Sequence, residues 1–86
     1  QRQAATVLFR SLSAAKEAYE QGERDGEKLR QIMKDMIASE PLAEIQYVSC
    51  ADYDTLEELD LIKGKALLSM AVFMGKTRLI DNFVLV

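Results

Sequence analysis

The amino-acid sequence predicts an α+β fold in which two antiparallel N-terminal helices pack on a small, mostly antiparallel three-stranded sheet. Two helix-type apolar patterns occupy the first forty residues, at about 3–21 and 26–39. A two-residue turn joins two later runs rich in Leu, Val, Ile and Phe, at about 66–74 and 77–84. Helices followed by a hairpin, with one more strand expected at about 45–52, are typical of an α+β domain.

Length and composition fit one globular domain spanning residues 1–86. The single cysteine, Cys50, cannot form an internal disulfide, so we expect a reducing, cytoplasmic location. Histidine is absent, which excludes a histidine-based triad and leaves no zinc-type ligand set. The net charge of −3 argues against nucleic acid as a partner, and no apolar run is long enough for a membrane span.

The first helix is predicted from an apolar stripe and a glycine stop. Its stripe consists of Ala4 or Ala5, Leu8, Leu12, Ala15 and Tyr19, widened by Val7 and Phe9. Gly22 is placed to end the helix near Gln21. Because the helix starts without a capping residue, we expect the chain to continue from a longer protein.

The second helix follows a short polar connector, so the two helices should pack antiparallel. Asp25 is the expected N-cap, with Glu27 in the first turn, and Pro41 ends the helix. Its apolar residues recur at i, i+3, i+4, i+7 and i+8, namely Leu29, Ile32, Met33, Met36 and Ile37. This spacing predicts that Met33 and Met36 belong to the core rather than to a binding surface.

The middle of the chain contains a strand and an acidic loop. The strand at 45–52 alternates imperfectly between apolar and polar residues. Asp54 and Glu57 resemble a capping box around a single helical turn. The acidic run 52–60 lacks the central glycine of a calcium loop, so we interpret it as a solvated acidic turn. Cys50 lies in the predicted strand with no histidine to activate it, so buried packing is favoured over a nucleophile.

The final hairpin turns at Gly75-Lys76, a pair that suits a type II′ turn because glycine accepts positive φ at its first central position. One face of the hairpin should join the core, and it pairs Val72 with Leu79 and Leu68 with Phe83. The other face pairs Phe73 with Arg78, Ala71 with Ile80, and Ser69 with Asn82. This second face alternates too weakly for a solvated surface, so we infer that something outside these residues partly covers it.

Several residues of the hairpin allow a functional and a structural reading. Gly75-Lys76-Thr77 matches the end of a phosphate-binding loop, but Met70 stands where that loop needs glycine and a strand follows instead of a helix. We therefore interpret it as a turn. Lys76 and Arg78 are expected to be solvated, and whether either contacts a ligand stays open. Asp81 and Asn82 lie on opposite faces of the last strand, and Ser69 is the expected partner of Asn82.

Three motifs, in order, resemble the C-terminal end of the pantoate–β-alanine ligase family. They are Ile45-Gln46-Tyr47-Val48, similar to the family's I-D-Y strand; Thr55-Leu56-Glu57, similar to its T-L turn; and residues 75–82, GKTRLIDN, similar to its closing G-x-T-R-L-I-D-N. The helical half also fits the preceding segment of the family, so the resemblance covers nearly the whole chain. The chain departs from the family at Tyr53 and Lys65, where the family usually has proline.

The resemblance implies an enzyme that joins pantoate to β-alanine with ATP and magnesium, through a pantoyl adenylate, releasing AMP and pyrophosphate. In the family the catalytic motifs lie in a larger N-terminal nucleotide-binding domain, and none of them occurs in these residues. We therefore assign no catalytic, cofactor-binding or metal-binding residue here. The chain is expected to be a lid that excludes water from the adenylate, catalytically silent and without bound cofactor when alone.

The partners implied are the chain's own N-terminal domain and, for the whole enzyme, pantoate and β-alanine; homodimerisation is left open. The alternative function is a stand-alone, non-enzymatic protein-interaction domain built on the helix pair. A small phosphate-loop NTPase fragment is a third reading, which would require affinity for ATP.

Overall fold

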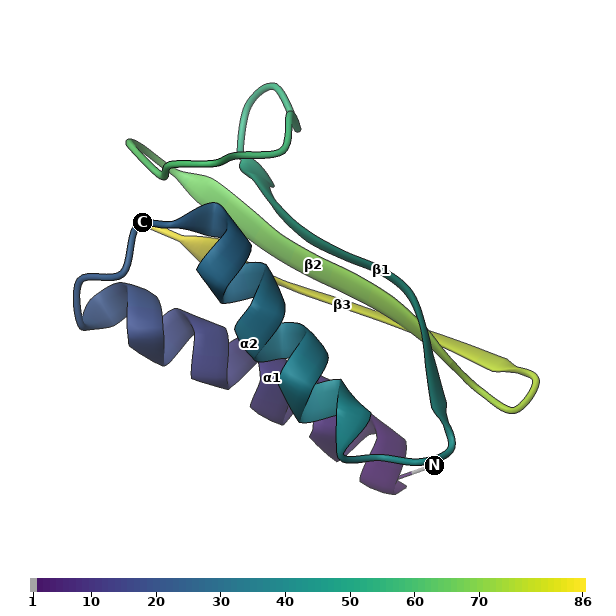
Figure 1. Cartoon of the computed structure of the whole chain (residues 1–86). Helices are drawn as coiled ribbons and strands as arrows, with labels where there is room; N and C mark the ends of the chain where they lie inside the picture. Colours follow the sequence, from purple (N-terminus) through teal and green to yellow (C-terminus); the bar gives the residue numbers. More distant parts are fainter. Residues whose placement is uncertain (1) are drawn as a thin grey trace.

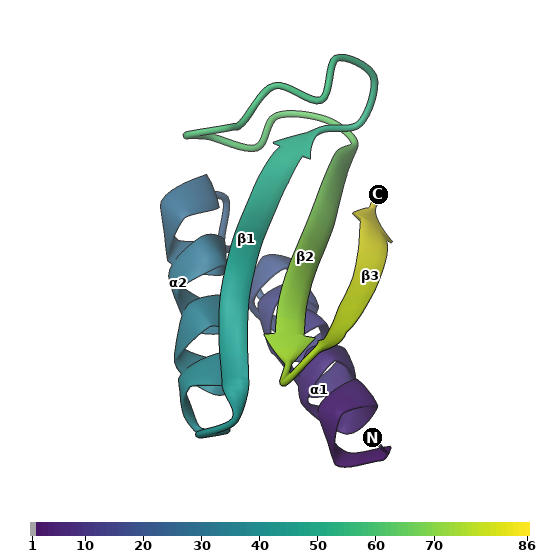
Figure 2. The same cartoon turned by 90° about the vertical axis from the view of Figure 1, so that its right-hand side faces the viewer.

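The computed structural model describes residues 2–86, with side chains described from Thr6 onward. Its elements are α1 (Arg2–Glu20), α2 (Gly26–Ala38), β1 (Ala43–Asp52), β2 (Ala66–Met74) and β3 (Thr77–Leu85). The two helices run antiparallel and both lie on one face of the sheet (Figures 1 and 2). Neither of these described helices is long and apolar enough to cross a membrane. The predicted α+β arrangement is therefore confirmed.

The helix ends follow from local sequence signals. Gly22 has a φ of +112° and its N–H donates to the carbonyl of Tyr19 at 3.0 Å, while Glu23 N–H reaches the carbonyl of Ala18 at 2.9 Å. This pair of backbone hydrogen bonds is a Schellman motif, which confirms that α1 ends at Gly22. At the start of α2 the carboxylate of Asp25 accepts from the backbone N–H of Glu27 at 2.9 Å, which confirms the predicted cap.

The core lies between the helices and the sheet, and the predicted stripes supply most of it. Fully buried members of this cluster are Leu12, Ala15, Leu29, Met33, Cys50, Ala66, Leu68, Met70 and Val72. The prediction that Phe9 and Met36 belong to the core was wrong. Phe9 is 58% exposed, with its ring edge-on to Phe83, and Met36 is half-buried outside the cluster. Ala4 and Ala5 lie outside the described side chains.

The sheet has the order β1-β2-β3 and is antiparallel throughout. The observed pairs Val72–Leu79 and Leu68–Phe83 confirm the predicted hairpin register. Gly75 has a φ of +64°, and the only non-glycine with positive φ in residues 2–86 is Leu56. Positive φ at the first central residue alone fits the predicted II′ turn.

A β-bulge explains the imperfect alternation of β1. Ile45 pairs with Val72 and Tyr47 pairs with Ala71, so Gln46 is an extra residue between two ladder pairs. The bulge lets Ile45 and Val48 both face the helices while Tyr47 points to the opposite side.

The loop after β1 differs from the prediction at its cap. Asp52, rather than Asp54, accepts backbone bonds, from Asp54 at 2.9 Å and Thr55 at 3.0 Å. Leu56 N–H closes one turn onto the carbonyl of Asp52, and its left-handed φ of 63° then ends that turn. The predicted capping box is therefore wrong, because the backbone carbonyl of Glu57, rather than its side chain, accepts from the N–H of Asp52, at 2.9 Å. The N–H of Glu57 donates to Thr55 Oγ1.

Candidate functional site

The helices leave the sheet face turned away from them uncovered, and we call this surface the outer face (Figure 2). It consists of four cross-strand rows: Glu44–Phe73–Arg78, Tyr47–Ala71–Ile80, Ser49–Ser69–Asn82 and Ala51–Leu67–Val84. Apart from the bulge in β1, these residues alternate along each strand with those that face the helices, because successive side chains of a strand point to opposite faces.

The outer face is neither fully solvated nor a closed core. Tyr47, Ile80 and Val84 are 39%, 54% and 38% exposed, whereas Ala51 and Ala71 in the same two rows are buried. Large apolar side chains that lie on one face and are open to solvent are typical of a surface that contacts another protein or domain. This mixed character agrees with the sequence prediction for the second hairpin face.

The hairpin end of the outer face is polar. Arg78 Nε donates to Gln46 Oε1 at 2.7 Å. Arg78, which was predicted to be solvated, is therefore exposed but also held by the side chain of the bulge residue. Lys76 is exposed at the turn. Sequence reasoning missed Gln46 because periodicity does not reveal a bulge.

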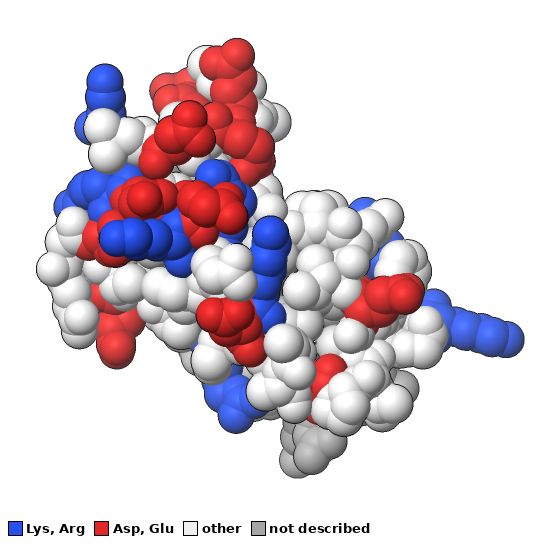
Figure 3. Space-filling view, viewed as in Figure 1, with Lys and Arg blue, Asp and Glu red and all other residues white. Residues whose placement is uncertain are grey.

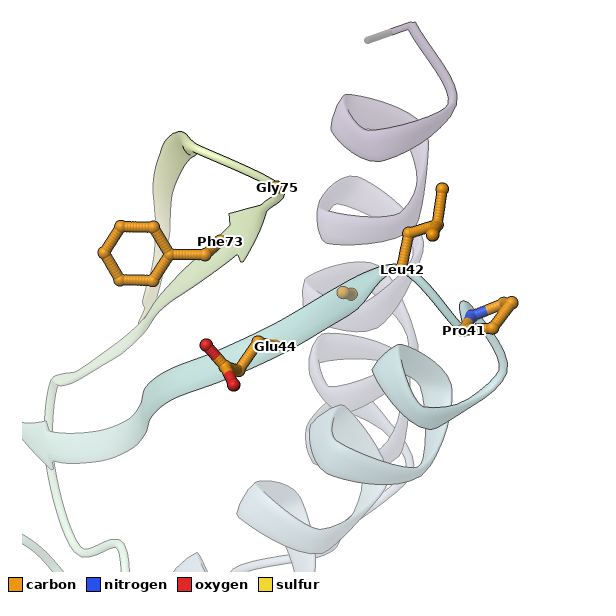
Figure 4. Close-up of a pocket in the computed structure, with 6 residues that line it drawn as sticks. Pro41, Leu42, Glu44, Phe73 and Gly75 are labelled. Carbon is orange, nitrogen blue, oxygen red and sulfur yellow. The ribbon is translucent and has the colours of Figure 1, made fainter.

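A nearby open hollow is lined by Pro41, Leu42, Ala43, Glu44, Phe73 and Gly75, with Glu44 and Phe73 pairing across β1 and β2 (Figure 4).

Asp81 and Asn82 in the middle of β3 lie on opposite faces as predicted, but the expected side-chain pair of Asn82 with Ser69 is absent. Asp81 is half-buried on the helix side, and its Oδ1 accepts from the backbone N–H of Asn82 at 2.8 Å. Asn82 stands directly opposite Ser69 in the ladder. Among the hydrogen bonds of the described side chains, none joins Asn82 to Ser69, so the amide of Asn82 remains open to solvent.

A second polar cluster joins α2 to the acidic loop, whose carboxylates form the acidic region at the top of Figure 3. Arg30 donates from Nε to Glu27 at 2.9 Å and from Nη1 to Glu58 at 3.0 Å and the carbonyl of Cys50 at 3.2 Å. Glu58 also accepts from the Ser49 hydroxyl and from Cys50 N–H. Burial opposes the charge of Arg30, but the bond to Glu27 and the two carboxylates outweigh it and raise the pKa of the guanidinium.

Backbone pairing holds the same loop to the connector between the helices. Gly26 N–H donates to the carbonyl of Asp60 at 2.9 Å, and Ile62 N–H donates to that of Arg24 at 2.8 Å. A Cβ on Gly26 would lie 2.0 Å from the carbonyl oxygen of Leu59, so only glycine fits this contact. The acidic run 52–60 is therefore anchored to the fold along one side, and several of its carboxylates face solvent.

Cys50 is fully buried in β1, which confirms the packing interpretation. Burial raises the pKa of its thiol, with the positive charge of Arg30 opposing that effect and the negative charge of Glu58 adding to it. A buried thiol held in its neutral form is a poor nucleophile.

Neither the Gly75-Lys76 turn nor the N-terminus of α2 offers a free phosphate-binding site. Thr77 begins a strand, so the Gly75-Lys76 turn lacks the helix N-terminus that holds a phosphate. The N-terminal amides of α2 are already bound by the carboxylate of Asp25, which would repel an anion. Among the described residues, no group of three or more Asp, Glu or Cys is placed to hold a metal ion.

Comparison with known proteins identifies the chain over nearly its whole length. The family model described as pantoate-beta-alanine ligase matches residues 1–84. The chain belongs to the pantoate–β-alanine ligase family. This confirms the resemblance carried by the closing strand.

Its relatives are pantothenate synthetases of much greater length. The Pelotomaculum thermopropionicum enzyme is 59% identical over 85 residues, and that of Roseiflexus castenholzii is 54% identical over 85 residues. Both alignments cover 99% of this chain but only 30% and 31% of the relative. The crystal structure of pantothenate synthetase from Thermus thermophilus matches 95% of the chain with a TM-score of 0.86 and 27% identity, over 29% of its own chain. The chain thus spans about 30% of the length of these ligases.

Proposed function

We propose that this chain is the C-terminal lid of an enzyme that condenses pantoate with β-alanine at the expense of ATP. The observation that carries the proposal is the alignment of 99% of the chain with pantothenate synthetases that are about three times longer. ATP and magnesium would then bind the N-terminal nucleotide-binding domain, and the whole enzyme would be cytoplasmic.

The proposed role is to exclude water from the reaction. A pantoyl adenylate is a mixed anhydride that water can hydrolyse before β-alanine attacks it. A covering domain would therefore increase the fraction of AMP release that yields pantothenate. The scaffold suits this task, because the helices and the core hold the sheet without using its outer face.

The test compares three proteins: the full ligase, the ligase shortened to remove this segment, and the 86-residue chain alone. We expect the full ligase to release about one AMP per pantothenate. The shortened ligase should form less pantothenate for each AMP released, and the 86-residue chain should form none. Pantothenate formation by the chain alone, or unchanged coupling in the shortened ligase, would overturn the proposal.

The stand-alone interaction domain remains the alternative, and the exposed outer face is the observation that favours it. The ligase lid and the stand-alone interaction domain predict different gene sequences upstream of Gln1. A nucleotide-binding domain encoded immediately before Gln1 supports the ligase, and a start codon at that position supports the interaction domain.

A further inference from the structure

We propose that the outer face is the surface through which this chain contacts the N-terminal nucleotide-binding domain of its own ligase. The inference rests on the proposed function and adds to it the contact surface and its residues. The helices already cover one face of the sheet (Figure 2). A domain that packs on the sheet can therefore contact only its outer face.

The outer face has three exposed large apolar side chains, whereas Phe9 is the one such side chain on the described parts of the two helices. Tyr47, Ile80 and Val84 lie in two of its rows, on either side of the row Ser49–Ser69–Asn82. The exposed side of α2 is polar up to its last residue, Ala38, and its polar members are Glu27, Lys28, Gln31, Lys34 and Asp35. Burial of apolar area is the main favourable term in association, so contact through the sheet gains more than contact through α2.

We expect the rest of the ligase to cover the outer face, because the chain spans only a small part of the length of its relatives. Almost every residue of the chain aligns, yet about 30% of each relative is covered. The larger part of such an enzyme is therefore tethered to this domain at high effective concentration, which favours it over any freely diffusing partner.

The mixed chemistry of the outer face suits a contact that opens and closes. A permanently covered sheet would be expected to resemble a core, whereas interfaces between domains of one chain are more polar. Here Asn82 and Ser69 lie between the apolar rows, and Arg78 with Gln46 lies at one end. These groups can bind water when the face is open and polar partners when it is covered.

The experiment measures the maleimide labelling of single cysteines introduced by Ile80→Cys or Val84→Cys. Leu61→Cys is the matched control, because Leu61 is 53% exposed against 54% for Ile80 but lies in the acidic loop. The native Cys50 is buried and should react slowly. Each variant is labelled in the 86-residue chain and in a full ligase without other reactive cysteines, with and without ATP plus pantoate.

We expect Ile80→Cys and Val84→Cys to react more slowly in the full ligase than in the 86-residue chain. With ATP and pantoate the slowing should reach about tenfold, which corresponds to about 1.4 kcal/mol in favour of the covered state. Leu61→Cys should react at the same rate in every case. Either outer-face variant suffices if the other fails to fold.

Equal labelling of outer-face and control cysteines in the full ligase would overturn the inference. If removal of the whole segment still uncouples AMP release from pantothenate, only the surface assignment fails and the proposed function stands. Protection that appears in the 86-residue chain alone and rises with its concentration would assign the face to a second copy, which also overturns the inference.

Discussion

Arg30 and Glu58, which are 28 positions apart in the sequence, meet with Nη1 and Oε1 3.0 Å apart. The Arg30 side chain is 12% exposed and that of Glu58 is 55% exposed, so the pair lies at the edge of the fold. Arg30 also binds the carbonyl of Cys50, so a single side chain links α2, β1 and the acidic loop.

Arg30→Ala should therefore destabilise the chain more than the loss of one surface ion pair would. It leaves the Cys50 carbonyl and Glu58 without their charged donor, and hydrogen bonds to charged groups contribute about 1.5–3 kcal/mol. Glu58→Gln should cost less, about 1 kcal/mol or below, because solvent screens this exposed carboxylate. Urea unfolding of the 86-residue chain measures both. Lys34→Ala, exposed on the same helix, is the control, and an equal loss in that variant would refute the linking role.

Gly26→Ala tests the close approach of α2 to the acidic loop. The added Cβ would meet the backbone oxygen of Leu59 at 2.0 Å, and a backbone neighbour cannot rotate away. We expect a loss of about 1–3 kcal/mol in the free energy of unfolding, the usual cost of overpacking. Gly64→Ala is the matched control, since nothing lies within 4 Å of its Cβ position. Equal thermal midpoints for the two variants would show that the loop moves away without cost.

Features set by neighbouring residues could be predicted from the sequence. The Asp25 cap, the Gly22 stop and the Gly75 turn each depend on a few consecutive residues, and the turn length alone fixes the register of the hairpin. The family could also be recognised, because the closing strand carries a specific motif. The outer face was partly foreseen, since its weak alternation is visible in the hairpin.

Features set by tertiary contacts could not be predicted. The bulge at Gln46 depends on pairing with β2, and it brings that side chain to Arg78 across 32 positions of sequence. Gly26 looks like an ordinary connector glycine until Leu59 is placed against it. Phe9 follows Leu8 directly, so it lies about 100° around the axis of α1 from that buried residue. Its ring therefore lies at the border of the apolar stripe, exposed and edge-on to Phe83.

Asp52 should make the chain sensitive to acid. Backbone N–H groups of Thr55 and Asp54 bind its carboxylate and lower its pKa in the folded chain. An unfolded aspartate has a pKa of about 3.9, so the stabilisation is present above that pH and is lost as the pH falls through the lower folded value. We expect Asp52→Asn, whose amide oxygen can accept the same bonds, to flatten the fall in urea midpoint below about pH 4. An unchanged slope would contradict this assignment.

Cys50 should produce the opposite dependence at alkaline pH. Burial raises the pKa of its thiol in the folded chain, whereas the thiol of the unfolded chain ionises near about pH 8.5. The folded state therefore binds more protons in this range, and its stability is complete below about pH 8.5 and declines as the pH rises toward the folded value. Urea midpoints between about pH 7.5 and 9.5 should fall more steeply for the native chain than for Cys50→Ala. The cavity left by the substitution lowers stability at every pH, so the comparison rests on the slope, and parallel slopes would show that Cys50 does not control this decline.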